Sequence, residues 1–389
     1  MKNEKNNPCA YFDNAATTKV SESVLSAVMP YLKESYGNPS SIYGLGLENQ
    51  RAITKAREQV AAALNCTSRE IYFTGSGTES NNWALQGRKH IITTAFEHHA
   101  VLHAVKCETT LLPVYENGIV KVEDLEKALT ENPDTDLVSV MTVNNEIGTI
   151  QPIAQIGALI AEQNEKRAKE GKHGRCFFHT DAVQAVGNVP IDVEAMNIDL
   201  LSLSAHKLHG LKGVGALYVR KGIKLAPFIF GGAQERGIRA GTENVAGIVG
   251  LGVAIEESVK DMESKNAELL KKQERIYNEV TKIPKVRLNG DLKRRLANSL
   301  NFSFEGIEGE ALLLQLDMKN IAASSGSACT SGSLDPSHVL LALGLPHEIA
   351  HGSLRISMSK YTTDEEVERL LTELPPIVEK LRAMSPLWS

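Results

Sequence analysis

Short apolar runs alternate with amphipathic stretches between residues 69 and 219, and this alternation is the feature that most constrains the fold. The runs have the length of strands, whereas the stretches between them repeat their apolar residues at helical spacing. Strands separated by helical patterns predict crossover connections and a mostly parallel sheet that is covered on both faces. The predicted strands are residues 70–73, 90–94, 137–143, 176–179, 199–204 and 215–219.

The pattern changes after residue 241. Helical periodicity runs from residue 248 to about residue 282, and strands are predicted at residues 286–288, 299–304 and 354–357. Further helical patterns cover residues 309–316 and 363–384. We therefore predict an α/β protein with a large domain over residues 14–260. A smaller α/β domain is predicted to comprise residues 1–13 and 261–389.

Composition excludes several classes of function. The 389 residues include 42 Lys and Arg against 47 Asp and Glu, a formal net charge of -5. Because the basic residues are interspersed with acidic ones, we expect no direct binding of nucleic acid. The apolar stretches are shorter than the about 20 residues that cross a bilayer, and residues 1–8 lack the apolar core of a secretory signal. We therefore expect a cytoplasmic protein that does not bind a membrane.

The cysteines do not indicate a structural framework. The five residues (Cys9, Cys66, Cys107, Cys176 and Cys329) are an odd, widely spaced set without a C-x-x-C pair, which argues against disulfides and zinc. His99 and His103 lie one helical turn apart, but no third ligand is apparent. We therefore predict no metal site.

Two predicted strand ends carry residues suited to one chemistry. Asp181 follows the run at residues 176–178, and Ser204, His206 and Lys207 follow the next run. In open α/β sheets, ligands bind outside the carboxyl ends of the strands. A lysine beside a serine and a histidine there suits a Schiff base with a phosphorylated aldehyde. A carboxylate at the same edge can hold a protonated ring nitrogen.

A third strand end predicts an anion site. The chain leads from residue 73 through Gly75 and Gly77 into a helix, so that open amides and the Thr78 hydroxyl can bind a phosphate. Taken singly, such an Asp is usually a turn residue, such a Lys a solvated charge, and such a glycine-rich turn only a turn. The three features in order, each at a strand end, favour a pyridoxal phosphate site.

The segment around Cys329 predicts a different element. Cys329 stands among Gly, Ser, Thr and Ala residues, a composition typical of a mobile loop rather than of a core. A buried structural cysteine would instead stand among Leu, Ile and Val. We therefore interpret Cys329 as an accessible, functional thiol on a loop of about residues 322–334.

Together these residues resemble the group I cysteine desulfurases, the NifS/IscS-like branch of the class V aminotransferase superfamily. The Cys-containing segment is highly specific, because group II enzymes carry a different, shorter Cys loop. The resemblance covers nearly the whole chain, at residues 11–18, 37–41, 77–80, 97–98, 143–148, 179–181, 204–207, 235–244, 324–337 and 354–357. It implies a pyridoxal phosphate-dependent transferase of fold type I.

The resemblance also implies roles for individual residues. Lys207 would hold the cofactor covalently and move protons, His98 would stack on the ring and act in acid–base steps, and Cys329 would receive the sulfur. Asn38 and Arg355 would hold the substrate carboxylate, a task suited to a guanidinium. The other cofactor-binding residues would be Gly77, Thr78, Asn145, Asp181, Gln184, Ser204, His206 and, from the second subunit of a homodimer, Thr242.

The implied reaction removes sulfur from L-cysteine and gives L-alanine and a persulfide on Cys329. The sulfur would pass to an acceptor protein such as an iron–sulfur scaffold or a tRNA-thiolating enzyme. Two alternatives stay open. A selenocysteine lyase or cysteine lyase on the same fold would not need Cys329. A non-catalytic subunit that docks partners would not need Lys207, Asp181 and Cys329 together. A transaminase is less favoured, because a mobile cysteine loop has no role in amino-group exchange.

Overall fold

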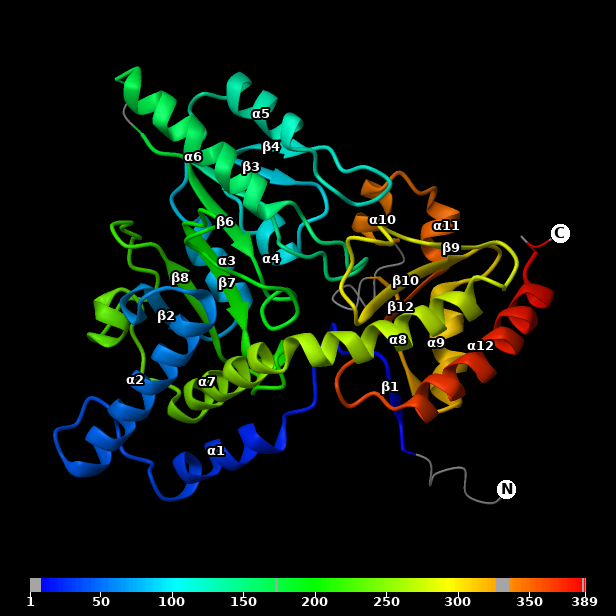
Figure 1. The fold of residues 1–389 in the computed structure, drawn as a ribbon, viewed down its shortest axis with the longest axis horizontal. Helices are drawn as coiled ribbons and strands as arrows, with labels where there is room; N and C mark the ends of the chain where they lie inside the picture. The colour runs from blue at the N-terminus through cyan, green and yellow to red at the C-terminus, as the bar shows by residue number, and fades with distance from the viewer. Residues whose placement is uncertain (1–7, 172–173, 327–335, 387, 389) are drawn as a thin grey trace.

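The computed structural model describes residues 8–171, 174–326, 336–386 and 388, and Figure 1 shows their arrangement. In the larger part of the molecule, β3 to β7 pair in parallel, whereas β8 pairs antiparallel with both β7 and β2. The predicted α/β class with a mostly parallel central sheet is therefore confirmed. The order of the seven strands is β2 (Ile71–Thr74), β8 (Gly215–Val219), β7 (Leu200–Ser204), β6 (Phe177–Asp181), β5 (Leu137–Ser139), β3 (His90–Thr94) and β4 (Glu108–Leu112).

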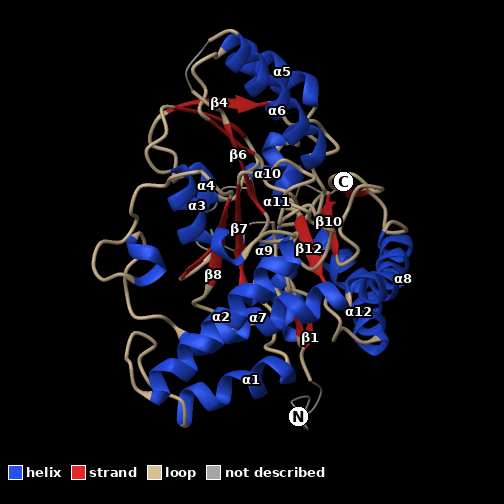
Figure 2. Ribbon diagram, turned by 60° about the vertical axis from the view of Figure 1, so that its left-hand side comes forward, coloured by secondary structure: helices blue, strands red, loops and turns tan. Residues whose placement is uncertain are grey.

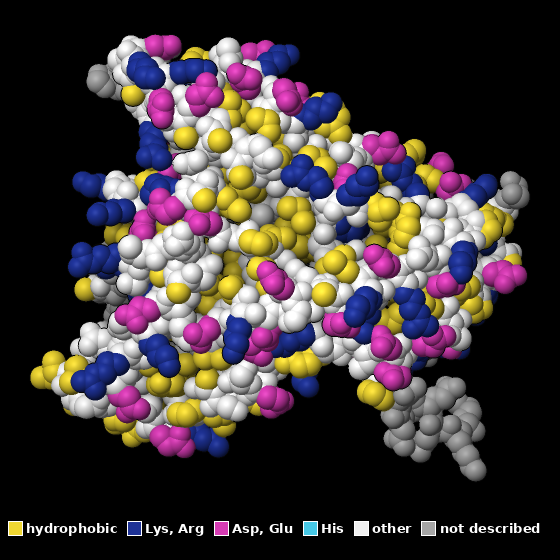
Figure 3. Space-filling view, viewed as in Figure 1, with side chains coloured by type: hydrophobic (Ala, Val, Ile, Leu, Met, Phe, Trp, Pro, Cys, Tyr) yellow, Lys and Arg dark blue, Asp and Glu magenta, His cyan; other side chains and the backbone are white. Residues whose placement is uncertain are grey.

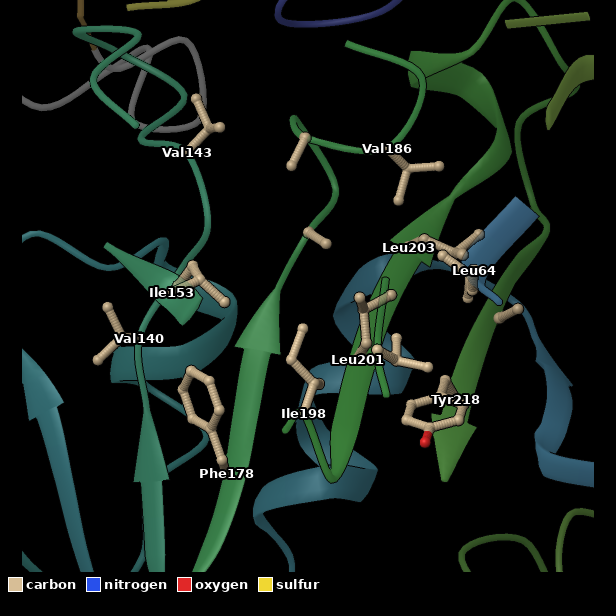
Figure 4. Close-up of a cluster of buried hydrophobic side chains, with 14 of the residues drawn as sticks. Leu64, Val140, Val143, Ile153, Phe178, Val186, Ile198, Leu201, Leu203 and Tyr218 are labelled. Carbon is tan, nitrogen blue, oxygen red and sulfur yellow. The ribbon is translucent and has the colours of Figure 1, made fainter. Parts of the chain in front are cut away.

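Alternate residues of the central strands belong to two separate buried clusters. Leu201 of β7 and Tyr218 of β8 lie in the larger cluster, part of which Figure 4 shows. Leu200 and Leu217, one residue away on the same strands, lie in a second cluster with Trp83. Because side chains alternate between the faces of a strand, both faces of this sheet are covered. The helices of this part are α1 (Glu22–Lys33), α2 (Gly44–Leu64), α3 (Gly77–Leu85), α4 (His99–Leu102), α5 (Val122–Glu131), α6 (Ile153–Lys169) and α7 (Val245–Lys260).

A smaller antiparallel sheet, with the strand order β12-β10-β9, forms the centre of the C-terminal part (Figures 1 and 2). The N-terminal strand joins this part, because β1 pairs with β11 and Phe12 lies in the buried cluster of the small sheet. Val339 and Ala350 pack in the larger cluster instead, so the predicted domain boundaries stay a prediction. The elements are β1 (Ala10–Tyr11), α8 (Met262–Val280), β9 (Val286–Leu288), β10 (Ser299–Phe304), α9 (Gly309–Met318), β11 (Ile321–Ala322), α10 (His338–Ala342), α11 (His347–His351), β12 (Ser353–Ser357) and α12 (Asp364–Met384).

The helical pattern over residues 248–282 forms two helices rather than one. α7 ends and α8 begins at Asp261, which is the C-cap of the first helix and the N-cap of the second. Aspartate is unfavourable inside a helix, which agrees with a break at this residue, although its side chain makes no cap hydrogen bond to a described residue. The two helices join the two parts of the molecule (Figure 1).

Charged side chains of both signs are interspersed over the face in Figure 3, and hydrophobic side chains gather in a hollow near its middle. This mixture differs from the single-sign surface that is typical of nucleic acid binding. In the described part of the chain, no helix combines the length and the apolar character needed to cross a membrane.

At Gly157, α6 packs closely against the segment that leads to β7. An added Cβ would lie 1.9 Å from the carbonyl oxygen of Met196, a backbone atom that cannot swing aside. We predict that Gly157→Ala lowers the free energy of unfolding by about 1–3 kcal/mol through overpacking. Gly44→Ala is the control, because no atom lies within 4 Å of a Cβ at that position. Urea unfolding measures both variants, and equal midpoints would contradict the prediction.

Candidate active site

The carboxyl edge of the central sheet carries a cavity of about 320 Å³. Asp181 ends β6 and Ser204 ends β7, so both residues lie at this edge. β2 runs in the same direction as β7, because β8 is antiparallel to both, and α3 therefore begins at the same edge. The cavity wall includes every predicted cofactor-binding residue except Thr242: Gly77, Thr78, His98, Asn145, Asp181, Gln184, Ser204, His206 and Lys207.

Lys207 lies in the short 3-10 helix η3 (Ala205–Lys207) that follows β7. Its Nζ donates hydrogen bonds to the carbonyl oxygens of Ala15 at 2.5 Å and Ala16 at 2.7 Å. The side-chain amide of Gln184 also donates to the Ala15 carbonyl, at 2.9 Å. The N-terminal segment therefore positions an amine at the cavity wall, where it can condense with an aldehyde.

Asp181 presents a buried carboxyl group with neutral hydrogen-bond donors. Its Oδ2 accepts from Nδ2 of Asn81 at 2.6 Å, and its Oδ1 accepts from the backbone amide of Val183 at 2.9 Å. The Oδ1 atom of Asn81 is itself buried and has no hydrogen-bond partner among the described residues. A carboxylate can accept more than one hydrogen bond at each oxygen, so Asp181 can also hold a protonated ring nitrogen.

The N-terminus of α3 presents hydrogen-bond donors to the cavity. Ser76 caps the helix by accepting from the amide of Glu79 at 3.1 Å. A Cβ at Gly77 would lie 2.6 Å from Cγ2 of Val183, so only glycine lets the helix start come this close to the strand end. Burial, followed by the charge of Lys207, lowers the pKa of His206 to about 4, so its ring is neutral at pH 7. Open amides, hydroxyls and this imidazole suit a phosphate.

His98 is the N-cap of α4, and its Nδ1 accepts from the amide of Ala100 at 3.0 Å. Burial is the largest effect on its pKa and lowers it, and the charge of Lys207 acts in the same direction against that of Asp181. A neutral ring whose Nδ1 accepts carries its proton on Nε2. His98 can therefore give or take a proton at the cavity.

Arg355 of β12 also lines the cavity and is almost completely buried. Its Nη2 pairs with Asp13 at 2.8 Å, and its Nη1 donates to the carbonyl of Asn145 at 3.2 Å. The Nε atom has no hydrogen-bond partner among the described residues. A buried guanidinium with a donor to spare suits the carboxylate of a small substrate.

Three predicted residues are not part of this wall. Asn38 is exposed, with its Oδ1 accepting from the amide of Ser40, so its role stays a prediction. Thr242 is exposed and lines a separate hollow with Gly75 and Arg239, so on this chain it does not reach the cavity. Cys329 lies outside the described residues.

Several residues at the cavity carried no role in the sequence analysis. Asn81 lies one helical turn after Gly77, a spacing that could have indicated it. Asp13, Ala15 and Ala16 come from the far end of the chain, and nothing in their residue types points to a cofactor. His338, at the first turn of α10, is a further residue of this kind.

The histidines near α4 form a stack rather than a metal site. The ring of His99 stacks on those of His103 and His338, with centroids 4.6 and 4.4 Å apart. Burial, then the neighbouring histidines, lowers the pKa of His99 to about 4. Within the described ranges, no group of three or more His, Cys, Asp or Glu residues is arranged to hold a metal ion.

The donor set fits pyridoxal phosphate part by part. Lys207 can bind the aldehyde, Asp181 can face the ring nitrogen, and the start of α3 with Ser204 can hold the phosphate. The fold and the site together define a pyridoxal phosphate-dependent enzyme.

Comparisons with known proteins agree with this class. The model of the aminotransferase class-V family matches residues 10–370. Cysteine desulfurase IscS of Methanosarcina thermophila is 53% identical over 98% of this chain and 95% of its own length. Cysteine desulfurase IscS of Clostridium botulinum strain Hall is 51% identical over 98% and 97%. The chain therefore belongs to the class V aminotransferases, in their cysteine desulfurase group.

Solved structures show the same relation. A NifS-like protein has a TM-score of 0.87 and 38% identity, with 96% of this chain and 100% of that chain covered. The structure of SspA in complex with cysteine has a TM-score of 0.76 and 35% identity, with 91% of this chain and 100% of that chain covered.

Glu97, next to His98, is a buried carboxyl group that should make the stability of the fold depend on pH. Its carboxyl is fully buried, with Oε1 accepting from the amide of Met141 at 2.8 Å, and burial raises its pKa from 4.5 to about 8. Between about pH 4.5 and about pH 8 the folded chain keeps this proton, whereas the unfolded chain has lost it. The free energy of unfolding therefore falls as the pH rises through this range. We predict that the free energy of unfolding falls less in Glu97→Gln than in the wild type. The two proteins should differ by at most roughly 1.4 kcal/mol for each unit by which the pKa of Glu97 differs between the folded and unfolded states.

Urea unfolding of both proteins at about pH 5 and about pH 8 measures this difference. The neutral amide does not titrate, so the comparison isolates Glu97 from the other buried groups. Parallel losses of stability in the two proteins would contradict the prediction.

Proposed function

We propose that this protein takes sulfur from L-cysteine, releases L-alanine and passes the sulfur on through Cys329. The observation that carries the proposal is the placement of Lys207, Asp181 and Arg355 around one cavity whose wall also includes Gly326, three residues before Cys329. A cofactor site, a carboxylate site and the start of the cysteine-bearing segment thus meet in one place.

In the proposed reaction, one residue binds the substrate carboxylate and two others move protons. When bound, pyridoxal phosphate supplies an aldehyde that condenses with amines and a ring that accepts the electron pair released at the substrate α-carbon. Arg355 binds the substrate carboxylate, and its pairing with Asp13 fixes the direction of the guanidinium. Lys207 moves the α-proton, and neutral His98 exchanges a proton through Nε2.

The thiol of Cys329 and the thiol of L-cysteine are the two reacting groups of the sulfur transfer. The Cys329 thiol loses its proton, and the thiolate attacks the sulfur of the substrate. The bond between the substrate β-carbon and sulfur breaks, and its electron pair stays on the carbon fragment. That fragment takes up a proton and leaves as L-alanine, while Cys329 keeps the second sulfur as a persulfide. This persulfide can pass its outer sulfur to an acceptor protein, such as an iron–sulfur scaffold or a tRNA-thiolating enzyme.

Replacement of Cys329 separates this mechanism from a lyase that works through the cofactor alone. We predict that Cys329→Ala loses L-alanine production by more than about 100-fold, because the nucleophile is gone. The purified, cofactor-loaded variant should keep its visible absorbance. Cys9→Ala removes an exposed thiol elsewhere and should have no effect. Equal L-alanine production by wild type and Cys329→Ala would favour the lyase, which could act on selenocysteine or cysteine.

We also propose that the enzyme is a homodimer. Exposed Thr242 does not reach the cavity of its own chain, and the resemblance assigns it to the phosphate of the second subunit. Large apolar side chains are also left in solvent: Ile42 is 92% exposed, Phe230 83% and Tyr36 75%. Apolar groups of this size are typical of a surface that a second chain covers.

Charged substitutions at these positions test the dimer. We predict that Ile42→Glu with Phe230→Glu shifts the protein from dimer to monomer, because burying two carboxylates is unfavourable. Analytical ultracentrifugation measures the mass, and cofactor affinity should fall with it if Thr242 acts across the interface. A wild-type monomer, or a monomeric variant with full cofactor affinity, would contradict the proposal.

A further inference from the structure

Glu146 is a buried carboxyl at the cavity wall that the proposed reaction does not use. Its backbone is held on both sides: Oδ1 of Asn144 accepts from the amides of Glu146 at 2.9 Å and Ile147 at 3.1 Å. Nδ2 of Asn301 donates to the Glu146 carbonyl at 3.1 Å. The side chain of Glu146 therefore extends from a turn whose backbone these hydrogen bonds hold in place.

The carboxyl group contacts Gly326, which directly precedes residues 327–335, and Ser337, the second residue after them. The hydroxyl of Ser337 donates a hydrogen bond to Oε2 of Glu146. Gly326 packs against the same oxygen, because a Cβ there would lie 2.3 Å from it. One oxygen atom thus touches the chain before and after the segment that contains Cys329.

Ser337 links this contact to a helix. Its Oγ also accepts from the amides of Val339 at 3.1 Å and Leu340 at 3.3 Å, and so caps α10. The next residue, His338, donates from Nε2 to the carbonyl of Glu97 at 2.9 Å. The chain after the cysteine segment is therefore tied both to Glu146 and to the residue that precedes His98.

The electrostatic setting explains why a carboxyl can stay there. Burial raises the pKa of Glu146, while the Ser337 hydrogen bond and the charges of His338 and Arg355 oppose that rise. A buried polar group without partners is costly, so the Ser337 contact has a specific role in keeping Glu146 inside.

We propose that Glu146 is a positioning residue for sulfur transfer: it holds Gly326 at the cavity wall and Ser337 against its own carboxyl group, and so fixes the chain on both sides of the segment that contains Cys329. This inference rests on the proposed function. It predicts that loss of the Glu146 contact slows formation of the Cys329 persulfide without weakening the binding of L-cysteine or of the cofactor.

The test compares Glu146→Ala, Glu146→Gln, Ser337→Ala and the double alanine variant in the cofactor-loaded protein. Persulfide on Cys329 is measured by mass spectrometry in a single turnover, and L-cysteine affinity by the change in cofactor absorbance. Either alanine variant should slow persulfide formation by about 10- to 100-fold, because an ångström of misplacement costs that much. Glu146→Gln should recover most of the rate, since its amide oxygen still accepts from Ser337.

The double variant should be no slower than the slower single variant, because both substitutions remove the same contact. Two controls are matched to the chemistry: Glu70→Gln removes another buried carboxylate, and Thr363→Ala removes another helix cap. Neither should change the single-turnover rate.

Three results would overturn the inference: unchanged persulfide formation in the alanine variants, additive losses in the double variant, or an equal loss of L-cysteine or cofactor affinity. If Glu146→Ala does not fold, Ser337→Ala alone decides by the same readouts. Failure of the proposed function would look different, because the wild type would then make L-alanine without any Cys329 persulfide.

Discussion

The buried carboxyl group of Asp181 is the constraint on which the rest of the site depends. Among the described residues its hydrogen bonds come from neutral groups, the side chain of Asn81 and the amide of Val183. A buried carboxylate is tolerated only with strong partners, and a protonated ring nitrogen would provide one with opposite charge. Because Asp181 ends β6, its place is set by the pairing of β6 with β5 and β7. The same pairing places Ser204 and Lys207 beside it.

The N-terminal segment supplies a second constraint that crosses the molecule. Ala15 and Ala16 hold Lys207, while Asp13 pairs with Arg355 of the small sheet. The amide of Ala15 also donates to Oγ of Ser357, on the same strand as Arg355, at 2.8 Å. One short stretch of chain thus sets the distance between the amine and the guanidinium. The proposed substrate carries both an α-amino group and an α-carboxylate, so it would use both side chains.

Local patterns predicted most strands, because apolar runs in buried strands are strong signals. Strands β3, β8, β9 and β10 have the predicted bounds, and Asp181 and Ser204 end their strands as expected. β4 was missed because it is an edge strand whose residues are mostly not buried. The contacts of Asp13, Ala15 and His338 could not be predicted, since they join residues far apart in sequence through backbone atoms or folded geometry.

The proposed substrate-binding residue Arg355 and the chain before Cys329 are joined through the backbone. Arg355 pairs with Ser324 across an isolated bridge, with its amide donating to the Ser324 carbonyl at 2.6 Å. Ser324 stands two residues before Gly326, which Glu146 contacts. The residue that would bind the substrate carboxylate is therefore in register with the start of the cysteine-bearing segment. One backbone hydrogen bond therefore ties the guanidinium proposed to bind the substrate carboxylate to the chain that leads to Cys329.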